Sequence, residues 1–171
     1  KNINLLAKAK KVKPEMLTAC VLDRPRHKSI ISSLKNMGVK INYITDGDVS
    51  GVISVGYAEK KIDIYVGTGG GPEGVLAAAA LKCMNCQMQT RLAFQNNKEE
   101  ARAKNLGIKN LNQKYSIDDM VKGDVIFCAT GVTDGDFIKG IEDLGSFFKA
   151  ETLVLHKSSN LNQIIKNNIK K

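Results

Sequence analysis

Tryptophan is absent from this sequence, and only 5% of its 171 residues are aromatic. Few side chains are therefore available on which nucleic-acid bases would stack. The sequence also lacks a compact block of lysine and arginine, although its formal net charge is +9. We therefore expect no nucleic-acid partner, and we interpret the positive field as favourable for a small anionic substrate.

Long apolar runs are missing as well. A membrane-spanning helix needs roughly 20 consecutive apolar residues, whereas the run over residues 75–81 ends at Lys82. The first residues contain repeated lysines and no secretory signal. We therefore expect no membrane partner. Because the chain starts without methionine and inside a helical pattern, we expect it to be part of a longer polypeptide.

Cysteine is scarce, with four residues in the chain. Cys83 and Cys86 have the CxxC spacing that is typical of zinc sites and redox pairs. Cys20 and Cys128 stand alone, and the two histidines are isolated. Buried or half-buried thiols are therefore the favoured interpretation, with a zinc site or a redox pair as alternatives. This usage of cysteine indicates a reducing, cytoplasmic setting.

Short apolar runs alternate with helical patterns along the chain. The alternation favours an α/β fold in which helices cover both faces of a sheet. The length suffices for one sizeable core, so we expect an α/β domain over residues 1–159 and a polar, basic, helical tail over residues 160–171. We expect strands at residues 16–22, 39–45, 62–66, 124–130 and 152–156, and helices at residues 5–12, 27–37, 49–58, 72–84, 98–105, 116–119 and 137–141.

The most informative segment is a cluster of glycines between the third expected strand and an alanine-rich helix, over residues 65–76. Glycines let the backbone approach a ligand closely, and a helix N-terminus offers free N–H groups. Pro72 suits the first turn of the helix. The Glu73 carboxylate would repel a bare phosphate but not a metal ion that carries one. The segment therefore favours metal-assisted phosphate chemistry.

The same glycines also match a dinucleotide fingerprint, through Gly69, Gly71 and Gly74. Pro72 interrupts the match, and Glu73 points to where a pyrophosphate would lie. No Walker lysine follows, and no acidic strand end comes about 20 residues later. A nucleotide-binding α/β module that uses the glycine-rich loop remains the alternative, and the net charge alone keeps a nucleic-acid binder as a third hypothesis.

Polar segments follow four of the expected strands. In α/β sheets, ligands bind outside the carboxyl ends of the strands. We therefore expect one site that combines residues 23–27, 46–48, the glycine-rich loop and residues 131–136.

Two of these segments have side chains suited to a sugar phosphate. Arg24 and Arg26 flank Pro25, and two guanidinium groups in a fixed turn suit a phosphate or carboxylate, although both can be surface residues. Asp46 and Asp48 can bind sugar hydroxyls or a cation, or they can cap the following helix.

Two further segments are expected to have structural roles. Asp134 and Asp136 repeat the spacing of Asp46 and Asp48, and capping of a short helix over residues 137–141 is the favoured role. His27 is expected to be a cap or a surface residue.

Four long motifs resemble class II fructose-1,6-bisphosphatase of the GlpX type, which sometimes also acts on sedoheptulose 1,7-bisphosphate. The resemblance runs from about Leu5 to Ser159, in the order and spacing of that family. The motifs are Val21-Leu22-Asp23-Arg24-Pro25-Arg26-His27, Ile44-Thr45-Asp46-Gly47-Asp48-Val49, Gly69-Gly70-Gly71-Pro72-Glu73-Gly74-Val75-Leu76-Ala77-Ala78-Ala79 and Ala129-Thr130-Gly131-Val132-Thr133-Asp134-Gly135.

The resemblance implies the C-terminal domain of the lithium-sensitive sugar and inositol phosphatase fold. It implies hydrolysis of the 1-phosphate of fructose 1,6-bisphosphate in gluconeogenesis, with Mn²⁺ or Mg²⁺ and without a redox cofactor. Glu73 matches the metal ligand of the family, and the matching substrate-binding residues are Arg24, Pro25, Arg26, Asp46, Gly47, Asp48 and Gly70.

The family's polypeptide is about twice as long as this chain, and its N-terminal half supplies most of the metal ligands. The resemblance therefore implies that this chain is the C-terminal portion and that its natural partner is the missing N-terminal half. We expect negligible hydrolysis by this portion alone, and a homo-oligomer for the whole enzyme.

Overall fold

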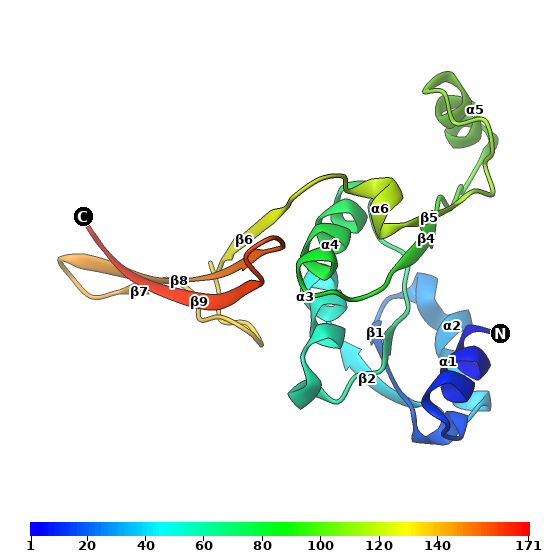
Figure 1. The fold of residues 1–171 in the computed structure, drawn as a ribbon, viewed down its shortest axis with the longest axis horizontal. Helices are drawn as coiled ribbons and strands as arrows, with labels where there is room; N and C mark the ends of the chain where they lie inside the picture. The colour runs from blue at the N-terminus through cyan, green and yellow to red at the C-terminus, as the bar shows by residue number, and fades with distance from the viewer. The chain divides into compact units, whose positions relative to one another are not determined.

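The computed structural model describes residues 1–171 (Figure 1). Three parallel strands form the centre of its first part, residues 1–73. They are β1 (Thr18–Leu22), β2 (Lys40–Ile44) and β3 (Ile64–Tyr65), in the order β2-β1-β3. The central strand β1 is buried over four of its five residues. Its continuous apolar sequence fits a parallel strand that is covered on both faces.

Helices cover both faces of this sheet. On one face, α1 (Asn2–Lys10) and α2 (Lys28–Asn36) join a core cluster with the strand residues Ala19 and Val21. On the other face lies α3 (Asp48–Ile53), where a Cβ atom built on Gly51 would be only 3.1 Å from the Tyr65 ring. The predicted α/β arrangement is therefore confirmed for this part of the chain.

Short 3-10 segments complete this part. They are η1 (Pro14–Met16), η2 (Pro25–His27), η3 (Ser54–Gly56) and η4 (Ala58–Lys60). The expected helix over residues 49–58 is thus α only as far as Ile53 and continues as two 3-10 turns. The helix α2 ends where the sequence predicts, because Gly38 just beyond it has a φ of +69°.

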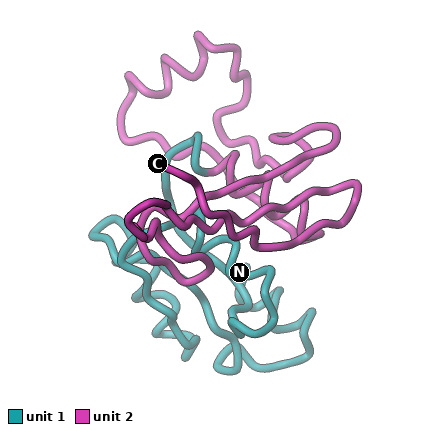
Figure 2. The backbone as a smooth tube through the Cα atoms, turned by 90° about the vertical axis from the view of Figure 1, so that its left-hand side faces the viewer, with its two compact units in different colours: residues 1–73 teal, residues 74–171 magenta.

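The chain divides into two compact units, residues 1–73 and residues 74–171 (Figure 2). The helix α4 (Gly71–Cys83) begins at the end of the first unit and continues in the second. The second unit also contains a two-stranded antiparallel sheet of β4 (Gln89–Arg91) and β5 (Lys114–Ser116). Its other helices are α5 (Asn97–Asn105) and α6 (Ile117–Met120), and Ser116 is the N-cap residue of α6.

A four-stranded antiparallel sheet follows, with the long strand β8 (Phe147–His156) at its centre. Its neighbours are β6 (Ile126–Thr130), β7 (Glu142–Asp143) and β9 (Leu161–Lys170). The prediction that residues 124–130 continue the first sheet is therefore wrong. The strand is present, but it pairs antiparallel with β8 in a sheet of its own.

The helical tail expected after residue 159 is also wrong in its secondary structure. Residues 161–170 form β9, which pairs with β8 along its whole length. Asparagine is a poor helix former, and isoleucine favours strands, so the long edge of β8 decides the conformation. The division into residues 1–159 and 160–171 as separate parts stays a prediction. None of the helices combines the length and hydropathy that a membrane span requires.

Candidate functional site

The three parallel strands end at one edge of their sheet, and a polar segment follows each of them. The register pairs Leu22 with Ile44 and Cys20 with Tyr65, so the carboxyl ends lie side by side. Residues 23–27 follow β1, residues 46–48 follow β2, and the glycine-rich loop follows β3. The structure therefore brings together three of the four segments that the sequence predicts at one site.

Residues 23–27, called the arginine turn from here on, are hydrogen-bonded to the glycine-rich loop. Pro25 starts the 3-10 segment η2, after Arg24 in extended conformation. The Arg24 side chain donates from Nη1 to the carbonyl of Asp23 at 3.0 Å. The Arg26 side chain reaches farther and donates from Nε to the carbonyl of Thr68 at 2.8 Å. Of the two predicted arginines, Arg26 thus has a defined contact with a neighbouring segment of the site.

The second segment brings Asp48 against the same loop. A Cβ atom built on Gly69 would lie 2.8 Å from Asp48 Oδ2, so a side chain there would displace the Asp48 carboxylate. Asp46 is exposed and accepts a hydrogen bond from the Gly47 N–H at 2.8 Å. The N-cap of α3 is Gly47, with no side-chain cap hydrogen bond. The alternative that these aspartates are N-cap residues of α3 is therefore wrong.

Glu73 lies in the first turn of α4 and folds back on the loop. A Cβ atom built on Gly70 would be 3.0 Å from Glu73 Cδ and still closer to Oε2. Because Gly70 has no side chain, the Glu73 carboxylate can occupy this space beside the loop. Carboxylate oxygens are ligands that hard divalent cations prefer. Glu73 therefore fits a metal-ligand role, although no group of three or more His, Cys, Asp and Glu residues in the chain is placed to hold a metal ion.

His27 lies in a different environment from the one that the sequence predicts. Its side chain is completely buried, so the predicted surface role is wrong, whereas His27 does occupy the N-cap position of α2, without a side-chain cap hydrogen bond. Nδ1 lies 2.7 Å from the Leu22 carbonyl, and Nε2 accepts from the Thr68 N–H at 2.9 Å. His27 precedes the apolar face of α2, three positions before Ile30 and seven before Leu34. That helical spacing is the signal that predicts its burial.

Tyr65 also lies at this edge of the sheet, although no sequence pattern predicted it as a site residue. Its hydroxyl lies where a Cβ atom on Gly67 would approach to 3.0 Å. Burial, and then the negative charge of Asp48, raise the pKa of Tyr65 to about 12, while Arg26 acts in the opposite direction. The phenol therefore keeps its proton at neutral pH and can donate a hydrogen bond at this edge of the sheet.

The fourth predicted segment differs from the other three, because β6 does not belong to the parallel sheet. No helix forms over residues 137–141, so the expected cap is wrong. Instead, Asp134 accepts from the Gly140 N–H at 2.9 Å and pairs with Lys139 at 3.3 Å. These contacts lower the pKa of Asp134, with the backbone hydrogen bond as the main cause. The loop is closed by its own residues.

A second polar cluster joins the start of β6 to the turn between β8 and β9. His156 Nε2 lies 2.8 Å from Asp124 Oδ2 and 3.0 Å from the Ser158 hydroxyl, and its Nδ1 lies 2.8 Å from the Ser159 hydroxyl. Hydrogen bonds from Ser158 and His156 lower the pKa of Asp124 to about 2. The Asp124 carboxylate also accepts from the Ser158 N–H at 3.0 Å. These bonds fasten the β8–β9 turn to the start of β6.

The cysteines are free thiols. Cys83 donates to the carbonyl of Val125 at 3.4 Å, and Cys86 donates to the carbonyl of Met84 at 3.7 Å. Burial raises the pKa of both thiols. A raised pKa disfavours the thiolate that metal binding and redox exchange require.

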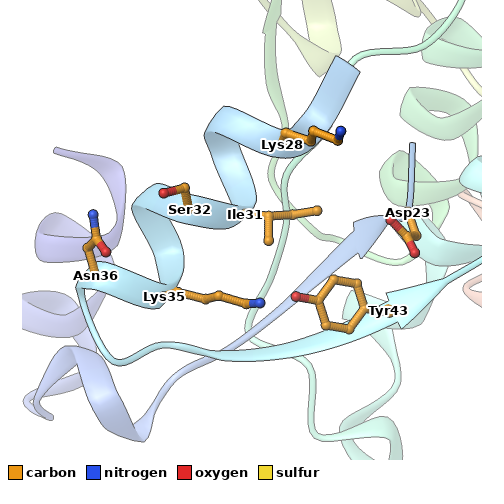
Figure 3. Close-up of a pocket in the computed structure, with 7 residues that line it drawn as sticks. All are labelled: Asp23, Lys28, Ile31, Ser32, Lys35, Asn36 and Tyr43. Carbon is orange, nitrogen blue, oxygen red and sulfur yellow. The ribbon is translucent and has the colours of Figure 1, made fainter. Parts of the chain in front are cut away.

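A shallow hollow of about 530 Å³ lies on the flank of the first sheet, between α2 and β2 (Figure 3). Figure 3 shows the Lys35 amine and the Tyr43 hydroxyl directed toward each other across it. Its lining includes Asp23 of the arginine turn and Lys28 directly after that turn, but none of the predicted substrate-binding or metal-binding residues. The candidate site is therefore defined by the strand ends and their contacts, not by this hollow.

Comparison with known proteins identifies the family of the chain. Residues 1–169 match the family described as bacterial fructose-1,6-bisphosphatase, glpX-encoded. The chain belongs to this family. The predicted resemblance to class II fructose-1,6-bisphosphatase is thereby confirmed.

Two named relatives of this glpX-type family member show how much of the polypeptide is present. The fructose-1,6-bisphosphatase class 2 of Haemophilus influenzae is 38% identical over 157 residues, which cover 84% of this chain and 47% of the relative. The D-fructose 1,6-bisphosphatase class 2/sedoheptulose 1,7-bisphosphatase of Synechococcus sp. strain JA-3-3Ab is 33% identical over 172 residues, with 93% and 50% covered. The chain thus spans about half the length of these relatives.

Proposed function

We propose that this chain forms the C-terminal half of a metal-dependent phosphatase that hydrolyses the 1-phosphate of fructose 1,6-bisphosphate. The products are fructose 6-phosphate and inorganic phosphate, in cytoplasmic gluconeogenesis. The observation that carries the proposal is the convergence of three segments at one sheet edge, held by the hydrogen bond from Arg26 to Thr68. The names of the relatives support the reaction class.

The substrate side of the proposed site uses the turns after β1 and β2. Arg24 and Arg26 bind a phosphate group of the substrate, and Pro25 holds the two guanidinium groups in one turn. Asp46 and Asp48 accept hydrogen bonds from sugar hydroxyls, with Gly47 between them in a left-handed conformation. Gly70 keeps the loop thin enough for the substrate to approach.

The metal side of the proposed site uses Glu73, which supplies one carboxylate ligand to Mn²⁺ or Mg²⁺. When bound, such an ion neutralises phosphate charge and lowers the pKa of a coordinated water. The other ligands come from the N-terminal half, because no group of three or more possible metal ligands is placed together in this chain. In this proposal the domain has the lithium-sensitive phosphatase fold, and the complete enzyme is a homo-oligomer.

The proposal is tested by supplying the missing half. Residues 1–171 are joined to the first half of the Haemophilus influenzae relative, and phosphate release from fructose 1,6-bisphosphate is measured with Mn²⁺ and with Mg²⁺. We expect the fusion to be active and the 171-residue chain alone to be negligibly active. Full activity of a homogeneous 171-residue preparation would contradict the division of the site. An inactive fusion that binds NAD(P) or ATP would favour the nucleotide-binding alternative.

A further inference from the structure

Both backbone polar groups of Thr68 are held by two consecutive residues of the arginine turn. Its carbonyl accepts from Arg26 Nε at 2.8 Å, and its N–H donates to His27 Nε2 at 2.9 Å. Thr68 itself is exposed, whereas His27 is completely buried. The glycine-rich loop after β3 is therefore hydrogen-bonded to one buried side chain, His27, and to one exposed side chain, Arg26.

The hydrogen bonds of His27 define its tautomer. A carbonyl can only accept, so Nδ1 carries the proton that bonds to Leu22 at 2.7 Å. Nε2 then presents a lone pair to the Thr68 N–H. With that tautomer the approach of Nε2 to the Thr68 carbonyl at 3.2 Å joins two acceptors and is no hydrogen bond. Neutral His27 thus connects the last residue of β1 to the glycine-rich loop.

Thr68 immediately precedes the most crowded part of the loop. A Cβ atom on Gly69 would lie 2.8 Å from Asp48 Oδ2, and one on Gly70 would overlap the Glu73 carboxylate. A movement of Thr68 therefore shifts the backbone of Gly69 and Gly70, beside which the carboxylates of Asp48 and Glu73 lie. The same movement changes the direction of the Arg26 guanidinium, because its Nε follows the Thr68 carbonyl.

We propose that His27 is a positioning residue that sets the phosphate-binding Arg26 and the metal-binding Glu73 in one arrangement through Thr68. This inference rests on the proposed function. In this arrangement His27 contacts neither the substrate nor the metal ion. Its loss is expected to weaken substrate binding and metal binding together, whereas loss of a residue that contacts only the substrate weakens only one.

Two conservative variants in the fusion enzyme separate the two hydrogen bonds. In His27→Asn the amide nitrogen takes the place of Nδ1, so the bond to Leu22 is kept and the bond to Thr68 is lost. In His27→Gln the amide oxygen takes the place of Nε2 and accepts from Thr68. His156→Gln changes the chain's other histidine and serves as the matched control.

The readouts are the KM for fructose 1,6-bisphosphate and the Kd for Mn²⁺ from a spectroscopic titration without substrate. We expect His27→Asn to raise both values roughly tenfold, as the loss of a buried hydrogen bond allows. At saturating Mn²⁺ and substrate, kcat stays within about threefold. His27→Gln is expected to lie near the wild type, Arg24→Gln to raise only the KM, and His156→Gln to change neither.

A lower Tm of His27→Asn with unchanged KM and Kd would overturn the proposal, because His27 would then act only in folding. A change in only one of the two values would overturn it as well, as would a His27→Gln variant that is as impaired as His27→Asn. If the wild-type fusion releases no phosphate, the proposed function fails. The Mn²⁺ titration still decides the role of His27 in that case, since a weaker Kd in His27→Asn supports it and an equal Kd refutes it.

Discussion

The pattern Asp-Gly-Asp follows a strand in each of the two units, at residues 46–48 and at residues 134–136. Its aspartates make different contacts in the two units. After β2, Asp48 lies against the backbone of the neighbouring glycine-rich loop. After β6, Asp134 is used within its own loop by the Gly140 N–H and by Lys139. The difference comes from the sheets, because parallel strands place consecutive carboxyl ends side by side, whereas antiparallel strands alternate their ends. An Asp-Gly-Asp pattern therefore indicates a shared site only where the strands are parallel.

The largest difference in activity between variants of the two units is expected at Glu73. Glu73→Gln in the fusion enzyme keeps the side-chain size and removes the negative charge of the proposed metal ligand. We expect kcat to fall by about 10²–10³ while the KM stays within about threefold. Steady-state phosphate release at saturating Mn²⁺ measures it. Asp134→Asn is the control from the second region and is expected to keep full activity; equal activity of the two variants would remove Glu73 from the site.

A smaller effect is expected where a glycine makes room for a carboxylate. In Gly70→Ala the new methyl group overlaps the Glu73 carboxylate, so we expect the Kd for Mn²⁺ to rise roughly tenfold, in the range that a displaced ligand allows. Gly74→Ala in the same helix is the matched control, since a Cβ there meets nothing within 4 Å. It is expected to bind Mn²⁺ normally and to stabilise the helix by about 0.5–1 kcal/mol. Identical titrations for the two alanine variants would contradict the crowding at Gly70.

The two arginines sharpen the comparison within the site. Arg24→Gln is expected to raise the KM for fructose 1,6-bisphosphate roughly tenfold with little change in kcat. Arg26→Gln also loses the bond to Thr68, so we expect it to raise the Kd for Mn²⁺ in addition. Parallel measurements of KM and Kd check both variants. If neither variant changes the KM, the arginine turn lies outside the substrate site.

The smallest effect on activity, and one confined to stability, is expected in the second region. Asp124 has a pKa of about 2 in the folded chain instead of 3.8. A lowered pKa gives stability that is present above pH 3.8 and is lost as the pH falls toward 2. Asp124→Asn should therefore lower the Tm at neutral pH, and the difference from the wild type should narrow on acidification. Thermal unfolding between pH 2 and pH 7 measures this, and a difference that is constant with pH would refute the role of the charge.

Local patterns in the sequence predicted the first unit well. The continuous apolar run of β1, the amphipathic α2 and the glycine at its end predicted elements that the structure contains. The positions of residues 23–27, 46–48 and the glycine-rich loop at one sheet edge followed from the rule for parallel strands. The roles of the site residues in binding stay predictions.

The features that the sequence analysis missed depend on long-range pairing. Nothing near residues 124–130 indicates whether their partner is β1 or β8, because a short apolar run suits either sheet. The Asn-rich residues 161–170 become a strand because β8 offers an unpaired edge over ten residues. The helical spacing of His27 predicts its burial, but its hydrogen-bond partner, the Thr68 N–H, lies 41 residues away in sequence. Such tertiary contacts override local preferences.

The most direct test of the shared site is anomalous X-ray diffraction from crystals of the fusion enzyme that contain Mn²⁺ and fructose 6-phosphate. The account predicts a manganese peak within about 2–2.6 Å of a Glu73 carboxylate oxygen, with the sugar phosphate between the arginine turn and Asp46. A manganese peak far from Glu73, or a sugar phosphate bound away from Arg24 and Arg26, would contradict it.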